Sequence, residues 1–308
     1  MRITNNMMIS NMMTNVNKNL QGLSKVQDKM QTGKKFQLPS DDPIGVSKSL
    51  KYYTDLSRIE QYKRNVDDAT SWMEVTESAV SQIGDILERA RELTVQAAND
   101  GTNTGEDKEK VSAEIKQLRE QIIKVANTKH AGRAIFSGYK TADDLIDSDG
   151  NYNIDLNTDE KTKYNVGSAD TIDVNVVGTE LFGLSNNGYK QDVSKGDTSE
   201  MIRVFDKLIQ GLDSDDVTSI DESITEIDET VSNVLSVRAK IGAKTNRLEL
   251  NKNRLEDQTL SVTKLLSKNE DVDIAEVVIE LKTRETVYQA SLHAGARIIQ
   301  PSLIDFLR

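Results

Sequence analysis

The sequence predicts a mainly α-helical protein, a long antiparallel coiled-coil bundle with a small inserted β-rich domain and with its N- and C-terminal segments paired. Three observations predict this fold. Apolar residues recur every seven positions toward both ends of the chain, short alternating segments fill the middle, and no proline lies between Ile44 and Gln300. Proline breaks a helix because it lacks an N–H donor and clashes with the preceding turn, so long helices are possible over this range.

The longest heptad run lies in the C-terminal half. Its apolar residues are Ile220, Ile227, Val234, Ile241, Leu248, Leu255 and Val262, and Ile224, Val231 and Leu266 supply the second seam position intermittently. Two runs with the same spacing lie in the N-terminal half. One comprises Tyr52, Ile59, Val66, Met73, Val80 and Leu87, and the other comprises Ile9, Val16, Leu23 and Met30, with Met13 and Leu20 beside it. An apolar stripe on a helix must be covered, so we expect the two long runs to pack antiparallel.

Turn chemistry places the ends of these elements. Ser40-Asp41-Asp42-Pro43 offers N-cap residues followed by a proline at the first helical position, so a second helix is expected from there to about Ala98. A third helix carries Val111 to Val125. Strand-like segments are expected at 134–139, at Tyr152/Ile154/Leu156 and at Ile172/Val174/Val176, and helix is expected to resume at Met201.

These elements predict three parts. Residues 1–39 and 269–308 are expected to form a terminal coiled coil that is disordered in the free monomer. Residues 40–140 and 196–268 are expected to form a long helical bundle with a short β-hairpin near 134–140. Residues 141–195 are expected to form an acidic, β-rich outer domain.

Charge differs between these parts of the chain, whose formal net charge is -11. Residues 1–39 carry six basic groups against one acidic group, and residues 269–308 carry four against seven, so we expect the two ends to attract each other. Residues 140–200 carry five basic groups against thirteen acidic groups, which predicts that the inserted domain points into solvent. The N-terminal lysines lack the interleaved aromatic residues of a nucleic-acid arm, so no nucleic acid is expected as a partner.

Composition excludes several classes of site. The chain has no cysteine, which excludes a disulfide framework, a zinc knuckle and a thiol nucleophile. No apolar run approaches the length of a membrane span or of a signal-peptide core, so we expect no membrane contact and no cleaved signal peptide.

Candidate catalytic and metal-binding residues are few. His130 and His293 lack a partner at metal-ligand or triad spacing. Asp147-Ser148-Asp149-Gly150 is interpreted as a polar turn, because a calcium loop through Gly150 would place Leu145 and Leu156 at ligand positions. Asp41 and Asp42 are interpreted as helix-capping residues, and Met7, Met8, Met12 and Met13 as packing groups. We therefore expect no enzyme activity, no cofactor and no metal.

Several stretches resemble the bacterial flagellin superfamily. They are Thr32-Gly33-Lys34-Lys35, Ser40 to Gly45, Arg91 to Thr102, Asn246-Arg247-Leu248-Glu249 and Asp271 to Glu276. The tail, Tyr288 to Leu292 and Gln300 to Leu307, departs from filament flagellins and is similar to the hook-associated protein 3 family, the junction proteins between hook and filament. Phe136 to Thr141 and the single Trp72 also fit that family better.

The resemblance implies a structural subunit that assembles through its paired ends. The expected assembly interface comprises Ile3, Ile9, Met13, Val16, Leu20, Leu23, Met30, Ile274, Val278, Leu281, Tyr288, Leu292, Ile299, Leu303 and Phe306. The implied partners are further copies of the chain in a ring, hook-associated protein 1 on the hook side, flagellin on the filament side, the filament cap protein during assembly, and an export chaperone at the C-terminal segment. The implied location is the extracellular flagellum, reached through type III export without a cleaved signal peptide.

Two other functions stay open at this point. A short filament flagellin would polymerise indefinitely. The tail from Gln300 to Leu307 is the sequence feature that distinguishes this chain from a filament flagellin. A secreted coiled-coil adaptor would be a stable monomer or dimer with ordered termini. Limited proteolysis separates the adaptor from the flagellar hypothesis, because loss of both ends to leave a core near residues 40–270 favours the latter.

Overall fold

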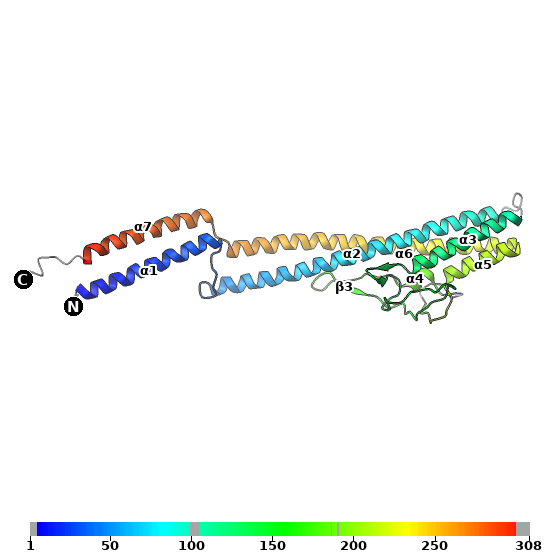
Figure 1. Cartoon of the computed structure of the whole chain (residues 1–308), viewed down its shortest axis with the longest axis horizontal. Coiled ribbons are helices and arrows are strands. Elements are labelled where there is room, and N and C mark those ends of the chain that lie inside the picture. The colour runs from blue at the N-terminus through cyan, green and yellow to red at the C-terminus, as the bar shows by residue number, and fades with distance from the viewer. Residues whose placement is uncertain (1–4, 99–104, 186, 190, 300–308) are drawn as a thin grey trace, which may run out of the picture. The chain divides into compact units, whose positions relative to one another are not determined.

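The computed structural model describes residues 5–98, 105–185, 187–189 and 191–299, and of residues 5, 6, 105–107, 298 and 299 it describes the backbone alone. The chain divides into two compact units (Figure 1). The terminal unit comprises Met1–Arg58 and Asp257–Arg308, and the central unit is Ile59–Glu256. This division places its boundaries within the two long helices, so the predicted boundaries at residues 39 and 269 stay a prediction.

Two long helices provide the framework of the central unit. Helix α2 spans Pro43–Ala98 and α6 spans Val217–Glu270, close to the two equal lengths that the heptad runs predict. Within the central unit they are antiparallel and are joined by four surface ion pairs, Lys63–Glu256, Asp67–Lys252, Glu77–Arg238 and Arg91–Asp228. The predicted seam is confirmed, since the six α6 residues from Ile220 to Leu255 are at most 2% exposed.

The start of α2 confirms the predicted cap. The Asp42 carboxylate oxygen Oδ1 accepts hydrogen bonds from the backbone N–H groups of Ile44 at 3.1 Å and Gly45 at 3.0 Å. These donors have no partner within the helix, so an aspartate directly before Pro43 satisfies them. The Asp42 carboxylate therefore serves as the N-cap of α2.

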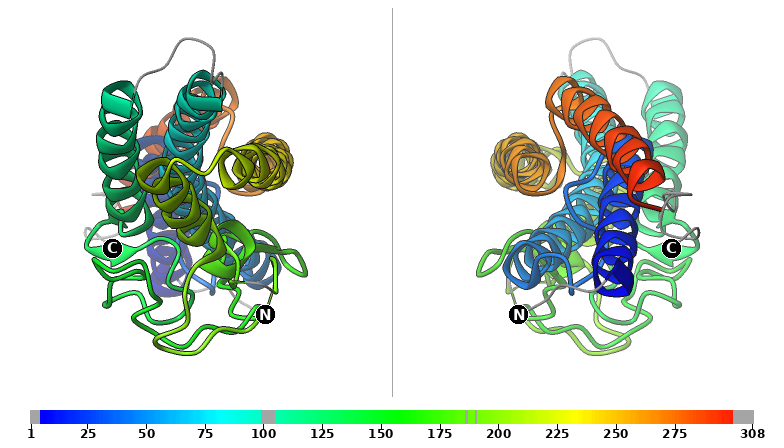
Figure 2. Two further views of the ribbon diagram at one scale, coloured as in Figure 1. Left: turned by 90° about the vertical axis from the view of Figure 1, so that its right-hand side faces the viewer. Right: turned by 90° about the vertical axis from the view of Figure 1, so that its left-hand side faces the viewer.

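Two shorter helices pack beside each other in the central unit, namely α3 (Gly105–Ala126) and α5 (Glu200–Ser214) (Figure 2). Helix α3 contains the residues Val111 to Val125 predicted for it and begins six residues earlier, and α5 begins one residue before the predicted Met201 and is a helix separate from α6. Ion pairs cross their surface, with Arg119 Nε 2.6 Å from Asp206 Oδ1 and Lys116 Nζ 3.1 Å from Asp213 Oδ2. Apolar residues of both helices are fully buried beneath these pairs.

The segment between α3 and α5, residues 127–199, is called the inserted segment, and few strands occur among its described residues. One antiparallel pair joins β1 (Lys129–His130) to β2 (Arg133–Ala134), and the other joins β3 (Lys163–Asn165) to β4 (Thr171–Asp173). The hairpin expected near 134–140 therefore lies at 129–134, where Gly132 takes a positive φ of 79° at the turn. The short helix α4 (Gly178–Phe182) follows β4.

The strand expected at Tyr152/Ile154/Leu156 is wrong. These side chains are buried, as their alternation predicts, but their backbone makes only the isolated bridges Ile146↔Tyr152 and Leu156↔Val193. The N–H of Tyr152 donates to the carbonyl of Asp197 and that of Leu156 to the carbonyl of Val193, so the segment pairs with scattered partners. Every second side chain of this segment is therefore buried although its backbone forms no continuous ladder of β-sheet hydrogen bonds.

The second buried stripe of α6 is mainly polar, with Val237 as an apolar member, which corrects the predicted seam. Ile224 and Val231 are only half-buried, whereas Ser223 and Thr230 are buried, and Asn251 is 6% exposed. This stripe faces the inserted segment. Tyr189 Oη donates to Thr230 at 3.2 Å, Asn233 Nδ2 donates to the carbonyl of Glu180 at 2.9 Å, and Asn251 Nδ2 lies 3.3 Å from an Asp170 carboxylate oxygen. Polar residues are favoured there because they satisfy the backbone and carboxylate groups that the inserted segment presents.

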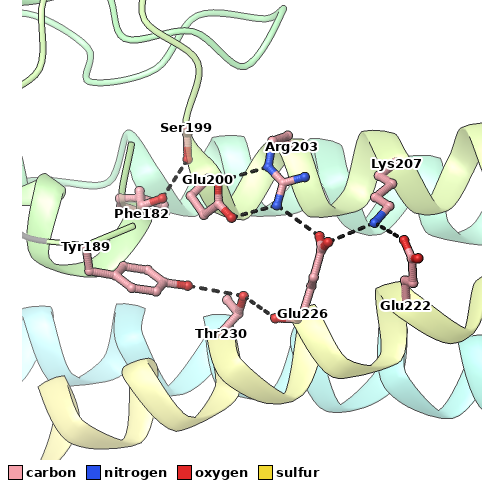
Figure 3. A network of polar contacts seen from close by, with 9 residues as sticks. All are labelled: Phe182, Tyr189, Ser199, Glu200, Arg203, Lys207, Glu222, Glu226 and Thr230. Carbon is pink, nitrogen blue, oxygen red and sulfur yellow. Dashed lines mark hydrogen bonds and ion pairs between the residues drawn. The ribbon is translucent and has the colours of Figure 1, made fainter. Parts of the chain in front are cut away.

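An ion-pair network joins α5 to α6 beside that stripe (Figure 3). Arg203 donates to both Glu200 and Glu226, and Lys207 donates to both Glu222 and Glu226, all within 3.0 Å. The hydrogen bonds that Arg203 donates to Glu200, with the charge of Glu226 adding to them, raise the pKa of Arg203, and the two glutamates that accept from Lys207 raise the pKa of Lys207 as well. The shared carboxylate of Glu226 links the two cations, which is a stronger arrangement than isolated surface pairs.

Candidate functional site

The residues considered for catalysis or metal binding have structural roles. Asp147 Oδ1 accepts the N–H groups of Asp149 and Asn151, and Arg119 donates to the carbonyls of Ser148 and Asp149, so these oxygens stabilise a turn. The His130 ring meets the Trp72 ring edge to face at 5.7 Å. Within the described ranges no group of three or more metal-ligating side chains occurs, and none of the described helices is long and apolar enough to cross a membrane.

The candidate site is the pair of helices made by the chain ends. Helix α1 spans Asn5–Thr32 and α7 spans Ile274–Ile299, and they lie side by side within the terminal unit (Figure 1). They are antiparallel, because Met12 meets Gly295 near one end while Lys34, just beyond α1, bridges to Asp271, just before α7. The pairing of the two ends that the heptads and charges predict is therefore present in the structure.

The inward seam of this helix pair follows a spacing of three and four. On α1 the seam residues, all with reduced exposure, are Ile9, Met12, Val16, Asn19, Leu23 and Val26, and on α7 they include Val277, Leu281, Tyr288, Ser291 and Gly295. Val26 is 3% exposed and Val277 is 5% exposed, and Asn19 Nδ2 donates to Ser291 Oγ at 3.3 Å. Together with Phe36, these two valines are the only buried apolar side chains of the terminal unit among the residues described.

A stripe of apolar residues lies outside this seam. Met13, Leu20, Val278 and Leu292 are 51%, 46%, 38% and 45% exposed. Each directly follows an inward residue, namely Met12, Asn19, Val277 or Ser291. In an antiparallel pair of right-handed helices, the residues that follow equivalent seam positions flank the same side, so the four form one surface. We call these four residues the outer apolar face.

The other side of the pair is mixed, because Met8 and Val287, which precede the inward residues Ile9 and Tyr288, are 44% and 46% exposed there, and a charged hollow lies toward the loop after α1. Gly22, Lys29 and Glu280 lie there, at the rim of an open cavity of about 480 Å³ that also contacts the loop after α1. Lys25 pairs with Asp41 at 3.2 Å across this loop, and Arg284 pairs with Glu280 at 3.2 Å. The hydrogen bond from Lys25 lowers the pKa of Asp41. The two sides of the helix pair therefore have different chemistry.

The structure sorts the expected interface residues into two sets. Ile9, Val16, Leu23, Leu281 and Tyr288 face the partner helix of the same chain, as expected, whereas Met13, Leu20, Val278 and Leu292 lie on the outer apolar face. Met30 and Ile274 are exposed where the pair ends, at 43% and 53%. Ile3, Leu303 and Phe306 lie outside the described residues, and the side chain of Ile299 does too.

Sequence reasoning missed the second seam position. It lies at Met12, Asn19 and Val26, whereas hydrophobicity pointed to Met13 and Leu20. Asn19, Ser291 and Gly295 are seam residues that an apolar pattern cannot detect. The available signal was the spacing of three from Ile9, Val16 and Leu23, which a heptad seam requires alongside the spacing of four.

Exposed apolar side chains concentrate in the terminal unit. Of the twenty large hydrophobic side chains that are exposed among the described residues, sixteen belong to this unit and four to the central unit. Apolar patches of this density on a soluble protein mark interaction surfaces. The terminal unit is therefore the part of the molecule that lacks a partner.

Comparisons with known proteins give a consistent result. The family model described as the bacterial flagellin N-terminal helical region matches residues 3–141, and that described as the bacterial flagellin C-terminal helical region matches residues 224–307. The chain is 27% identical to flagellar hook-associated protein 3 of Escherichia coli K12, over 96% of each chain. It is 29% identical to the flagellin of Bacillus subtilis 168, over 94% of each chain.

A solved structure is similar as well. A flagellar hook-associated protein from Vibrio parahaemolyticus superposes with a TM-score of 0.65 at 26% identity. The match covers 75% of this chain and 100% of that one. The two family models cover both helical ends, and the part between them includes most of the inserted segment together with α5.

Proposed function

The chain belongs to the bacterial flagellin family, and on that premise we infer that it is a structural component of the flagellum, at the junction between hook and filament. Its full-length relatives are structural flagellar proteins, and hook-associated protein 3 is among them. The chain is not an enzyme. The observation that carries the mechanism is the uncovered outer apolar face of the terminal helix pair.

Assembly covers that face with a second copy of the chain. Full burial of a leucine or methionine side chain stabilises by about 1.5 to 3 kcal/mol, so four such residues can offset part of the ordering cost of two helices. Because only two valines of the described seam are buried, apolar contacts stabilise the helix pair only weakly in the free monomer. We therefore expect the terminal helices to become ordered as copies assemble.

The two sides of the pair favour a ring or helical arrangement. A two-fold dimer buries the same surface on both copies, whereas unlike surfaces produce head-to-tail contacts that close into rings or continue as helices. The outer apolar face and the charged cavity are unlike in this sense. This supports a ring of copies within the axial structure.

The family membership supports a set of specific partner proteins, which we propose for this chain. They are hook-associated protein 1 on the hook side, flagellin on the filament side, the filament cap protein during assembly, and an export chaperone at the C-terminal segment. We also propose an extracellular location reached by type III export without a cleaved signal peptide.

Electron microscopy of cells deleted for the gene tests the junction role. The expected result is hooks without filaments, with flagellin shed into the medium and detected by a filament antibody. Intact filaments would contradict the flagellar role and favour a coiled-coil adaptor. Normal hooks with no flagellin anywhere would show that the chain is the filament protein, the alternative that its similarity to a Bacillus flagellin raises.

Complementation of that deletion tests the outer apolar face. Leu20→Glu should abolish filament growth, because a charge cannot be buried against a second copy without a partner. Leu250→Glu is the matched control, since Leu250 is 70% exposed in the central unit and should be tolerated. Normal filaments with Leu20→Glu would exclude this face from assembly.

A further inference from the structure

The loops that precede α7 and follow α1 meet in a compact polar cluster. Lys34 and Asp271 form an isolated antiparallel bridge, in which the N–H of Lys35 donates to the carbonyl of Glu270 at 2.6 Å and the N–H of Val272 donates to the carbonyl of Gly33 at 2.9 Å. Gly33 takes a positive φ of 70° at this point, which lets the chain leave α1 toward the bridge. Two segments far apart in sequence are thereby joined by main-chain hydrogen bonds.

Glu270 is the centre of this cluster. It is 6% exposed, which is costly for a carboxylate unless it is paired and hydrogen-bonded. Lys34 forms an ion pair with it, and Tyr53 Oη donates to Oε2 at 2.9 Å. Lys34 Nζ also lies 5.9 Å from the centroid of the Tyr53 ring. One buried carboxylate therefore joins the loop after α1, helix α2 and the end of α6.

Neighbouring groups hold the end of α6 in the same place. Asn269 Nδ2 donates to the carbonyl of Gly45 and to Ser49 Oγ, both at 2.9 Å, and Lys35 Nζ donates to the carbonyl of Lys268 at 2.8 Å. We call the group Lys34, Lys35, Tyr53, Asn269 and Glu270 the latch. All five residues belong to the terminal unit.

The seam of the terminal helix pair specifies its register only weakly. A heptad repeat stays in phase when one helix slips by seven residues, so apolar contacts alone do not choose between registers. Within the described pair the discriminating contacts include the hydrogen bond of Asn19 to Ser291, the fit of Met12 against Gly295 and the approach of Arg284 to Gly22. The outer apolar face depends on the register, because Met13 and Leu20 come from one end of the chain and Val278 and Leu292 from the other.

We propose that Glu270 is a positioning residue: through the latch it sets the register of α1 against α7, and so aligns the two halves of the outer apolar face for a second copy of the chain. Helix α1 ends two residues before Lys34, and α7 begins three residues after Asp271. A slip by one heptad moves the helices by about 10 Å, which this bridge does not permit. The consequence for assembly rests on the proposed function, whereas the register can be measured in the free chain.

Cysteine cross-linking in the full chain measures the register, because the natural sequence has no cysteine. The pair Met12→Cys with Gly295→Cys reports the register of the structure, since a Cβ at position 295 lies 3.7 Å from Met12 Cγ. The pair Met12→Cys with Tyr288→Cys reports a slip of one heptad. Oxidation traps pairs that form transiently, so the ratio of the two yields is informative even where the helices are short-lived.

With an intact latch the first pair should form at least ten times more disulfide than the second. Glu270→Ala should lower this ratio at least fivefold, although position 295 lies about 35 Å along α7 from the latch. Glu276→Ala, which removes an exposed carboxylate in the first turn of α7, is the matched control and should leave the ratio unchanged. Lys34→Met and Tyr53→Phe should lower the ratio by smaller factors.

An unchanged ratio in Glu270→Ala would overturn the proposal, provided that Trp72 fluorescence shows a folded central unit. Filament growth distinguishes this inference from the proposed function. A lost register with normal filaments would overturn the link between latch and assembly. Normal filaments with Leu20→Glu would count against the outer apolar face alone, and the register measurement would still decide the role of Glu270.

Discussion

The central and terminal units are built from the same kind of helix, yet they treat their apolar residues in opposite ways. In the central unit the heptad positions of α2 and α6 are almost entirely buried, and α3, α5 and the inserted segment add further layers. In the terminal unit the described buried apolar residues are Val26, Phe36 and Val277, while sixteen large apolar side chains are exposed. A heptad pattern therefore shows that a helix needs a partner, but not whether the partner belongs to the same molecule.

The polar interactions differ as well. The central unit uses shared networks, such as the one in which Glu226 links Arg203 and Lys207 (Figure 3). It also has surface ion pairs between α2 and α6. The terminal unit concentrates its polar contacts at the latch, where main-chain hydrogen bonds surround Glu270. One unit is stabilised along its length, whereas the other is joined at one end and leaves its surface for partners.

The largest expected effect is a difference between the two units in how much a truncated apolar side chain lowers the free energy of unfolding. Ile241→Ala removes a fully buried side chain of the α6 seam and should lower the free energy of unfolding by about 3 kcal/mol. Leu20→Ala, on the outer apolar face, should change it by less than about 0.5 kcal/mol. Urea denaturation followed by circular dichroism and by Trp72 fluorescence measures both. Equal losses in the two variants would contradict the comparison.

A smaller effect tests the close approach of α1 and α7. A Cβ at position 295 would lie 2.5 Å from Met12 Cε, so Gly295→Leu overpacks the seam at a cost of about 1 to 3 kcal/mol. The gain in helix propensity, about 0.8 kcal/mol, offsets part of this. The residual protection of the α7 amides from hydrogen exchange should fall severalfold, and Met12→Ala should restore it.

Gly242→Leu provides the control for that prediction. Gly242 lies in α6, and a Cβ there would meet no atom within 4 Å. The same substitution should therefore stabilise its helix slightly through propensity alone. Acceleration of exchange around position 242 would show that the effect at Gly295 is not specific to the seam.

The smallest effect concerns the attachment of the β3–β4 hairpin to α6. Burial acts to raise the pKa of Asp170, but the hydrogen bond and charge of Arg247, together with the hydrogen bonds from Arg254 and Asn251, outweigh it and lower the pKa. The stabilisation is therefore present above the unfolded pKa of about 3.9 and is lost as the pH falls below it. Asp170→Asn should cost about 1 kcal/mol at neutral pH and remove this part of the acid sensitivity.

Trp72 emission measures that change. Trp72 lines a small cavity together with Tyr164 of β3 and with Val174, which follows β4, so release of the hairpin should alter its environment. The wild-type emission should shift as the pH falls below the unfolded pKa of about 3.9, and the shift should be smaller in Asp170→Asn. Identical titrations in the two proteins would exclude Asp170 as the attachment.

Much of the fold could be predicted from the sequence. The seam of α6 from Ile220 to Leu255 is buried as its spacing predicts, and α2 starts at Pro43 after the Asp42 cap and ends at Ala98. These features are local or periodic. They depend on apolar side chains at fixed helical spacing and on the unpaired N–H groups of a helix end. Both can be recognised from the sequence of a single segment.

The remaining features depend on partners that are distant in sequence. The strand expected at 152–156 became isolated bridges because its hydrogen-bond partners are the scattered residues 193 and 197. The polar stripe of α6 was missed because Thr230 and Asn251 are buried by the inserted segment rather than by another helix. Likewise Gly295 and Asn19 became seam residues through contacts with Met12 and Ser291.

The sequence by itself determined that this chain is a long helical bundle with uncovered ends, and its short motifs determined the family. Tertiary structure alone decided which residues of the terminal heptads face inward and which form the outer apolar face. The physical reason is that a heptad repeat defines a stripe on one helix, whereas the register between two helices is chosen by a few specific contacts, here the latch around Glu270 and the hydrogen bond of Asn19 to Ser291.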